Sequence, residues 1–254
     1  MRREGTIAVR PEFDVAYEDE GALVVSKAAP LLMHPVGAKQ EPTLWQGVRE
    51  LLAYELACGG QVSLINRLDR ETSGLVLIAK NARAAHELGC AMQQHAVHKE
   101  YLAIVHGWPT WEHACCAEPI LRLADVAEAE VRVRQACHPA GKPCRTEFWV
   151  ERRVAARGEL PAMALVRCRP VTGRMHQIRV HLAYLGHPIV GDKIYRDETC
   201  YLRFIEQGWT PELAGELILP RHALHACDLY FPAADGSTAH AHSPLPPDMA
   251  ALLH

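Results

Sequence analysis

The chain has 254 residues, of which 49% are hydrophobic and 22% charged, and its formal net charge is −3. This composition is typical of a globular protein with a substantial core and excludes an intrinsically disordered chain. No apolar run approaches the roughly 18 residues of a membrane span, and the first residues lack the apolar segment of a signal peptide. We therefore expect a cytoplasmic protein with no membrane partner.

The cysteines and histidines do not form a recognisable metal motif. The nine cysteines contain no C-x-x-C pair and no regular spacing, which argues against a disulfide framework and a zinc ribbon. His176 and His181 are five residues apart, off the i,i+4 spacing of a helical zinc pair, and His240 and His242 lie in a proline-rich tail. We expect no metal and no cofactor.

Charge is distributed unevenly along the chain. Between residues 166 and 196 six Lys/Arg stand against one acidic residue, whereas between residues 112 and 130 five acidic residues stand against one arginine. Such a distribution can steer a polyanion to one face of a molecule. The sequence therefore permits a basic cleft on an acidic body.

Apolar periodicity and capping residues predict the elements of the first half of the chain. Thr43 and Asn81 are suitable N-caps, and the Gly-Gly pair at 59–60 is a stop signal. The predicted elements are a strand over 22–27, a helix from 43 to about 58, a strand ending near 80, a helix over 82–96 and a strand over 99–107.

The second half begins with an irregular, acidic stretch over 108–141, where we expect only hairpins and loops. Alternating apolar residues predict strands around 146–150 and 163–167, and a last strand over 224–231. Between them a helix is predicted over 174–185, ended by Gly186. Arg179 is expected on a face beside the buried stripe of this helix, which consists of Met175, Ile178, Leu182 and Leu185.

Strands outnumber helices and do not alternate regularly with them, which favours an α+β fold with a mixed, mainly antiparallel sheet and flanking helices. No internal repeat, low-complexity block or linker divides the chain. We therefore expect a single catalytic domain over residues 1–254.

Asp69 is the residue whose surroundings most need an explanation. Two arginines flank it in Asn66-Arg-Leu-Asp-Arg-Glu-Thr-Ser-Gly74, and the apolar run 75–79 follows. Taken alone, this stretch is compatible with a plain turn, because Asp, Ser and Gly are common turn formers. It also has the form of a loop that sets one acid beside cationic partners.

Other motifs, in a fixed order along the chain, decide between these interpretations. They are Arg67-Leu-Asp-Arg-Glu-Thr-Ser-Gly74, Lys99-Glu-Tyr101, Gly141-Lys142 with Thr146, Thr172-Gly-Arg-Met-His-Gln-Ile-Arg-Val-His-Leu182 running on to Asp192, and Ala223-Leu-His-Ala226. The set resembles that of the RluA-type family of RNA pseudouridine synthases over roughly residues 15–231. The resemblance implies the fold of those enzymes, with a central active-site cleft, and RNA (tRNA or rRNA) as the partner.

The implied reaction converts a uridine into pseudouridine. It breaks the bond from C1′ to N1, turns the uracil and rejoins it through C5, with no redox step and no metal. One carboxylate near the sugar and base is enough, either as a nucleophile or as the base that starts elimination at the sugar. By the resemblance this carboxylate is Asp69.

The resemblance also implies roles for the residues around Asp69. Arg179 would pair with the carboxylate and keep it ionised, and Tyr101 would stack on the uracil. The uridine must first be flipped out of the RNA, and Arg67 would fill the gap. The basic segment 167–196 would hold phosphates. Further substrate contacts are predicted for Lys99, Arg174, His176, Gln177 and Leu224.

The chain departs from the family pattern in three places. Asn66 stands where the family usually has His, and Lys27-Ala-Ala-Pro30 replaces the usual Lys-Pro-x-Gly. We also expect no S4-type RNA-binding domain, because no segment before residue 15 is long enough for one. Target selection would then depend on the catalytic domain.

Two other functions stay open at this point. A catalytically inactive RNA-binding or RNA-folding module could keep the same fold, and a histidine-rich metallohydrolase would contain metal. Asp69, Tyr101 and Arg179 together favour the enzyme, because a binder of an anionic ligand has no need of a carboxylate. We expect a monomer with no DNA partner, and the sequence does not identify the modified uridine.

Overall fold

The computed structural model describes residues 13–35 and 41–254. Its strands are β1 (Phe13–Glu18), β2 (Ala22–Lys27), β3 (Ser63–Leu64), β4 (Ser73–Ala79), β5 (His98–His106), β6 (His113–Cys116), β7 (Ile120–Arg122), β8 (Gln135–Cys137), β9 (Thr146–Val154), β10 (Met163–Pro170), β11 (Leu224–Pro232) and β12 (Thr238–His242). Its α-helices are α1 (Leu44–Leu51), α2 (Ala53–Ala57), α3 (Ala82–Gln93), α4 (Gln177–Tyr184), α5 (Glu198–Gln207), α6 (Pro211–Leu217) and α7 (Pro247–Ala250). Short 3-10 turns span Leu123–Asp125 and Ala251–Leu253.

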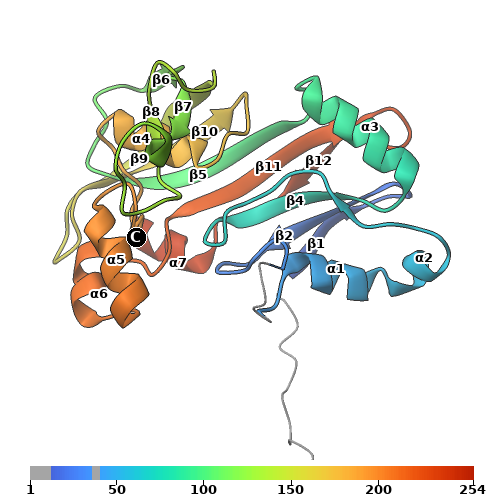
Figure 1. Ribbon diagram of the computed structural model, residues 1–254, viewed down its shortest axis with the longest axis horizontal. Coiled ribbons are helices and arrows are strands. Elements are labelled where there is room, and N and C mark those ends of the chain that lie inside the picture. The colour runs from blue at the N-terminus through green and yellow to red at the C-terminus, as the bar shows by residue number, and fades with distance from the viewer. Residues whose placement is uncertain (1–12, 36–40) are drawn as a thin grey trace, which may run out of the picture.

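Ten of these strands form one curved sheet in the order β1-β2-β4-β11-β5-β10-β9-β6, with β12 paired to β11 and β3 to β4 (Figure 1). Strands β4 and β11 run parallel, and the other pairs in the sheet are antiparallel. The expected α+β fold, with a mainly antiparallel sheet and flanking helices, is confirmed. Within the described ranges no helix is both long enough and apolar enough to cross a membrane.

Local signals predicted the elements of the first half well. Thr43 caps α1 with a reciprocal box, because its hydroxyl accepts from the Gln46 N–H and the Gln46 side chain accepts from the Thr43 N–H. The helix expected to continue to residue 58 is interrupted at Leu52, so α1 and α2 are separate. Asn81 caps α3 as predicted, and α3 ends at Gln93, three residues early.

The start of α4 corrects two predictions. The helix begins at Gln177 instead of residue 174, because His176 has the left-handed φ of 55° and breaks the pattern. Met175 therefore precedes the helix, and its side chain is 49% exposed. It does not belong to the buried stripe, whereas Ile178 and Leu182 do.

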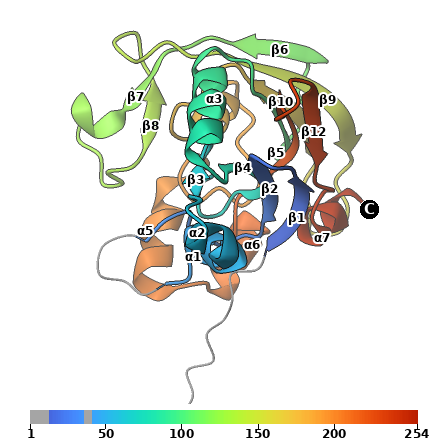
Figure 2. The same ribbon diagram turned by 90° about the vertical axis from the view of Figure 1, so that its right-hand side faces the viewer.

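Both faces of the sheet are covered. All seven residues of β4 are buried, and because successive side chains of a strand point to opposite faces, they supply two core clusters. Val76 and Ile78 pack in a cluster with residues of α1, α4 and α7, while Leu75 and Leu77 pack in a cluster with residues of α3. Figure 2 shows α3 on one side of β4 and α1 on the other.

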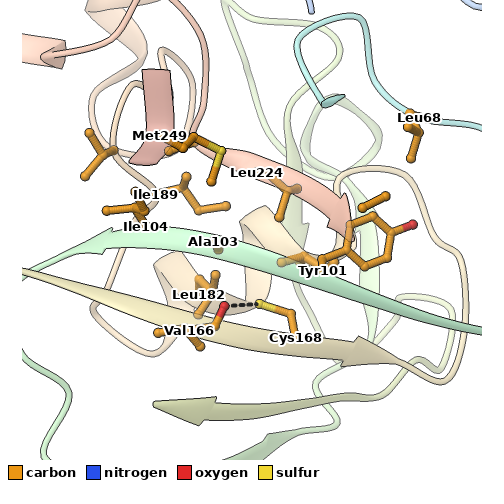
Figure 3. Close-up of a cluster of buried hydrophobic side chains, with 14 of the residues drawn as sticks. Leu68, Tyr101, Ala103, Ile104, Val166, Cys168, Leu182, Ile189, Leu224 and Met249 are labelled. Atoms are coloured by element: carbon orange, nitrogen blue, oxygen red, sulfur yellow. Dashed lines mark hydrogen bonds between the residues drawn. The ribbon is translucent and has the colours of Figure 1, made fainter. Parts of the chain in front are cut away.

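The cluster that contains Val76 and Ile78 extends along the centre of the sheet as far as the loop before β4. Tyr101 of β5 and Leu224 of β11 belong to this cluster, which also contains Leu68 from the loop before β4. In Figure 3 Tyr101 lies at one end of the cluster, and its hydroxyl points away from the packed side chains. The rigid centre of the fold thus presents an aromatic ring beside the loop that holds Asp69.

Candidate active site

One cavity of about 390 Å³ is lined by all nine residues that the sequence singled out. Its walls come from the loop 65–72, from strand β5, from the segment 170–179 and from the first residue of β11. The nine residues are Arg67, Asp69, Lys99, Tyr101, Arg174, His176, Gln177, Arg179 and Leu224. The fold therefore brings together motifs that lie more than a hundred residues apart.

The loop that carries Asp69 is held by its backbone and by Asn66. The backbone carbonyl of Arg70 accepts hydrogen bonds from the Leu31 N–H (3.0 Å) and from Nζ of the buried Lys27 (3.2 Å). The Asn66 amide accepts from the Leu77 N–H (2.7 Å) and donates to the Leu75 carbonyl (3.3 Å). Asn66 thus fastens the loop to β4, which shows what this departure from the family pattern does in the fold.

The strand after this loop passes unusually close to β11. Gly74 has a φ of 108°, and a Cβ added there would lie 2.2 Å from the carbonyl oxygen of Ala226. A side chain at this position is therefore excluded by both conformation and space. This close approach keeps the end of the Asp69 loop next to the first residues of β11, where Leu224 enters the cavity.

Arg179 connects two carboxylates. One guanidinium nitrogen donates to Oδ2 of Asp69 at 2.9 Å, so the ion pair expected from the resemblance is present. The other two nitrogens donate to Asp192, at 2.7 and 3.0 Å, in a fork that matches the carboxylate. Asp192 is fully buried, and its Oδ1 also accepts the backbone N–H groups of Ile194 and Tyr195.

These contacts decide the charge of both acids. Burial, the largest single influence, would raise the pKa of Asp69, but the charge and hydrogen bond of Arg179 together with His176 and His222 outweigh it and leave that pKa below its ordinary value. Burial likewise opposes ionisation of Asp192, yet the charge and hydrogen bonds of Arg179 hold its pKa well below the usual range. Both carboxyl groups are therefore negatively charged at neutral pH.

His176 faces Asp69 from the turn before α4. Its Nε2 lies 3.7 Å from Oδ2 of Asp69, and its Nδ1 is 2.7 Å from the Tyr195 hydroxyl. Burial and the positive charge of Arg179 lower the pKa of His176 to about 4, so the ring is neutral at pH 7. The Tyr195 hydroxyl also accepts the Gln135 N–H, which favours donation of its own proton to Nδ1. The ring proton then sits on Nε2, facing Asp69.

Tyr101 and Lys99 supply the wall from β5. Tyr101 is buried, and burial together with the charge of Asp69 raises the pKa of its phenol, so the ring stays neutral. Burial also lowers the pKa of Lys99, whose Nζ lies 3.9 Å from Sδ of Met92. A flat neutral ring next to an ionised carboxylate suits a planar, uncharged base better than a charged ligand.

The remaining predicted residues differ in how exposed they are. Arg67 and Arg174 are exposed at the cavity. Gln177 is buried, and its amide accepts from Thr172 and the Arg174 N–H and donates to Thr146 and the Arg145 carbonyl. Gln177 therefore supports the turn before α4, and its contact with substrate stays a prediction.

Most cations of the basic segment 167–196 are engaged in ion pairs, and the predicted contact of this segment with phosphates stays a prediction. Arg167 pairs with Glu100 and Glu151, Arg169 pairs with Glu147, and Lys193 pairs with Glu71. Acidic residues from distant parts of the chain neutralise them, which the local charge count did not reveal. Arg174 is the cation of this segment that is exposed at the cavity.

Sequence reasoning gave no role to Asp192 and Tyr195, which hold Arg179 and His176. The available signal was that Asp192 is the single acid in a basic segment, next to an apolar run. An acid in that position needs a cationic partner if it is buried. In the described part of the chain, no group of three or more His, Cys, Asp or Glu residues could hold a metal ion.

Comparison with known proteins gives one consistent picture. The family model for RNA pseudouridylate synthase matches residues 21–184. The ribosomal large subunit pseudouridine synthase D of Nitrosomonas europaea is 33% identical over 247 residues, which cover 94% of this chain and 64% of that protein. The ribosomal large subunit pseudouridine synthase C of Salmonella typhi is 37% identical over 218 residues, which cover 85% and 61% of the two chains. This chain thus spans less than two thirds of the length of these two relatives.

Among solved structures, human RNA Pseudouridylate Synthase Domain Containing 4 superposes with a TM-score of 0.71 at 25% identity. The alignment covers 94% of this chain and 91% of the human one. The likeness therefore extends beyond the 21–184 segment that the family model matches.

Proposed function

Because the chain belongs to the RNA pseudouridylate synthase family, we propose that it isomerises a uridine in RNA to pseudouridine, with Asp69 as the essential carboxylate. The observation that carries this proposal is the ion pair between Asp69 and Arg179 inside the cavity that Tyr101 also lines. An ionised acid beside a neutral aromatic ring is what the reaction needs at the glycosidic bond. A cavity of about 390 Å³ lies within the usual range for small-molecule sites.

In the proposed reaction the ionised Asp69 acts at the ribose of the flipped uridine. It either attacks C1′ or removes a proton from the sugar, and both routes break the bond from C1′ to N1. The uracil then turns on the Tyr101 ring and C5 bonds to C1′, which releases Asp69 from C1′ on the first route and is accompanied by return of the proton to the sugar on the second. The proton lost from C5 is balanced by the one gained at N1. Arg179 keeps the carboxylate oriented during these steps because Asp192 holds its other side.

Entry of the uridine requires base flipping, which costs about a few kcal/mol of unstacking. Stacking on Tyr101 would recover about 1–3 kcal/mol. Arg67, two residues before Asp69, would enter the gap in the RNA, and its exposure at the cavity supports this role. Arg174 at the rim would contact a phosphate, while Lys99 and Leu224 would border the base.

The names of the relatives point to the large ribosomal subunit as the substrate, so we propose a uridine of large-subunit ribosomal RNA as the target. We further propose that residues 1–254 form a single catalytic domain and that the protein acts as a monomer in the cytoplasm. Size-exclusion chromatography with light scattering and cell fractionation test the last two points.

The deciding experiment is pseudouridine mapping across total RNA from cells with the gene intact, deleted, or restored as Asp69→Ala. We expect one site to lose its modification on deletion and to regain it with the intact gene but not with the variant. Recovery of the site with Asp69→Ala would contradict the role of Asp69. A cellular effect that the variant rescues without any modified site would favour an RNA-binding module instead.

A further inference from the structure

The loop that carries Asp69 is a partition between two cavities. A second cavity of about 370 Å³ opens on the other side of this loop. Five residues line both cavities, namely Arg67, Leu68, Asp69, His176 and Arg179. The second cavity therefore begins where the proposed site for the uridine ends.

The outer wall of the second cavity is aromatic and apolar. Tyr201, Phe204 and Ile205 of α5 line it, and the Ile205 side chain is 66% exposed. Lys193 lies over the Phe204 ring, with Nζ 4.7 Å from the ring centroid. Two aromatic side chains on one helix are suited to stack on a base, since every base presents a π-face.

The opposite wall is polar and carries positive charge. The exposed Arg70 lines it, 3.0 Å from Glu41, and Lys193 donates to Glu71 at 2.7 Å. The lining also contains Arg67 and Arg179, and Glu41 and Asp192, which lie outside it, pair with Arg70 and Arg179. Arg67 and Arg70 are the exposed cations here, and a phosphate group could approach them.

His222 supplies a buried polar atom without a partner. Its ring is 2% exposed, and one nitrogen, Nε2, lies 2.7 Å from the Thr72 hydroxyl. Within residues 13–35 and 41–254, its Nδ1 is buried without a hydrogen bond, and the nearest carboxylate oxygen, Oε2 of Glu71, is 3.6 Å away. A buried polar atom in this state is costly and is matched when a ligand group reaches it.

We propose that the second cavity binds the nucleotide directly next to the target uridine in the same RNA strand. The RNA chain is continuous through the flipped uridine, so a neighbour must lie within one nucleotide of Asp69, and this cavity shares that wall. Tyr201 and Phe204 would stack on the neighbouring base, Arg70 would face its phosphate, and Nδ1 of His222 would hydrogen-bond the base. This inference rests on the proposed function, because it takes the uridine in the first cavity as its reference.

The test combines protein variants with RNAs that lack one base. The RNA is a transcript around the mapped uridine, either intact or with an abasic residue on its 5′ or its 3′ side. Tyr201→Ala removes the stacking surface, and Tyr54→Ala, which removes a tyrosine that is 80% exposed on α2 and lines neither cavity, is the control. The readout is kcat/KM for pseudouridine formation.

We expect Tyr201→Ala to lower kcat/KM on intact RNA by about 5- to 150-fold, the range for one base stacked on an aromatic ring, and Tyr54→Ala to leave it unchanged. The wild type should convert one of the two abasic RNAs slowly. On that RNA Tyr201→Ala should cause no further loss of kcat/KM, whereas on the other two RNAs it should lower kcat/KM. An equal loss on all three RNAs, or no loss on any, would overturn the proposal.

A second pair of variants tests the cavity without turnover. Ile205→Asp puts a negative charge at its mouth, whereas Gln207→Asp puts the same charge on α5 outside the lining. The probe is a short oligoadenylate with one central uridine, and the readout is its dissociation constant. Ile205→Asp should weaken binding at least about threefold more than Gln207→Asp, and equal effects would contradict the subsite. If the wild type converts no uridine at all, the proposed function fails, while this binding comparison still decides the subsite.

Discussion

The two sides of Arg179 differ in how completely they are enclosed. On one side Asp192 is fully buried, takes two guanidinium hydrogen bonds and accepts two backbone N–H groups. On the other side Asp69 takes one hydrogen bond from Arg179, and its side chain is 31% exposed. The first contact is closed to any ligand, whereas the second opens onto two cavities.

This difference shows how a buried arginine can serve a reactive acid. Asp192 compensates the burial of the guanidinium, so Arg179 is fixed before any RNA binds. Asp69 is held by a single bond and keeps an oxygen free of Arg179, which a nucleophile or base requires. Arg179 is thus anchored by Asp192 on one side and orients Asp69 on the other. The following predictions test these two roles.

The largest effect among the supporting residues is expected for Arg179→Lys. Lysine keeps the positive charge but cannot donate in a fork to Asp192 and also reach Asp69. Turnover should fall by about 100- to 1,000-fold, while RNA affinity stays within about threefold. Single-turnover kinetics and filter binding check this, with Arg83→Lys on the exposed face of α3 as the matched control. A loss of affinity with unchanged turnover would make Arg179 a phosphate contact.

Asp192→Asn should weaken the contact that fixes Arg179 without removing any contact with substrate. The amide can still accept the backbone N–H groups, but the buried guanidinium loses its compensating charge. We expect a loss of about 3–5 kcal/mol in unfolding free energy and a loss of about 10- to 100-fold in turnover.

A double variant separates positioning from general damage. If Asp192 acts through Arg179, Asp192→Asn combined with Arg179→Lys should turn over no more slowly than Arg179→Lys alone. Multiplied losses would show that Asp192 affects the site by another route. Denaturant unfolding of all three variants gives the change in unfolding free energy of each.

Arg174→Ala addresses the rim of the open side and should have a small effect. Arg174 is exposed and donates to the Pro143 carbonyl, so its removal leaves the buried ion pairs intact. RNA affinity should fall by about 3- to 10-fold at low salt, and the slope of log K against log salt should lessen by about 1. Unchanged salt dependence would exclude a phosphate contact.

The pH dependence should show the smallest change. The pKa of Asp69 is below its ordinary value. The ionised carboxylate therefore predominates at every pH above this lowered pKa and is lost as the pH falls through it. The pKa of His176 is lowered to about 4, so its ring is already neutral at pH 5. We expect kcat/KM on a fixed RNA to be flat from about pH 5 to 8 and to fall only in stronger acid. A step near pH 6.5 would show that His176 titrates at its ordinary value.

The comparison of the two sides also shows what the sequence could predict. Thr43, Asn81 and the apolar run of β4 act on their own neighbours, so caps and strands followed from local patterns. The left-handed turn at His176 did not, because the side chains around it, His176 and Gln177, are held by Tyr195 and Thr146, which are distant in the sequence. Asp69 was found because its motif belongs to a set of separated motifs whose order along the chain resembles that of a known family.

Contacts between distant segments also lie outside local patterns. Arg167 counts as a cation of a basic segment, yet it pairs with Glu100 of β5 and Asp228 of β11, which adjoin it only in the folded sheet. Asp192 received no role for the same reason, since its partner Arg179 lies on a separate element. A charge count describes one segment of the chain, whereas the topology of the fold decides which charged side chains form ion pairs.

The role of Asp69 is tested most directly by single-turnover conversion of the mapped RNA by Asp69→Asn. This variant keeps the shape of the side chain and its bond to Arg179 but removes the negative charge. If the ionised Asp69 is the reacting group, conversion falls by at least about 10,000-fold while RNA affinity stays within about threefold. Conversion at more than about a tenth of the wild-type rate would show that the ionised Asp69 is not the reacting group.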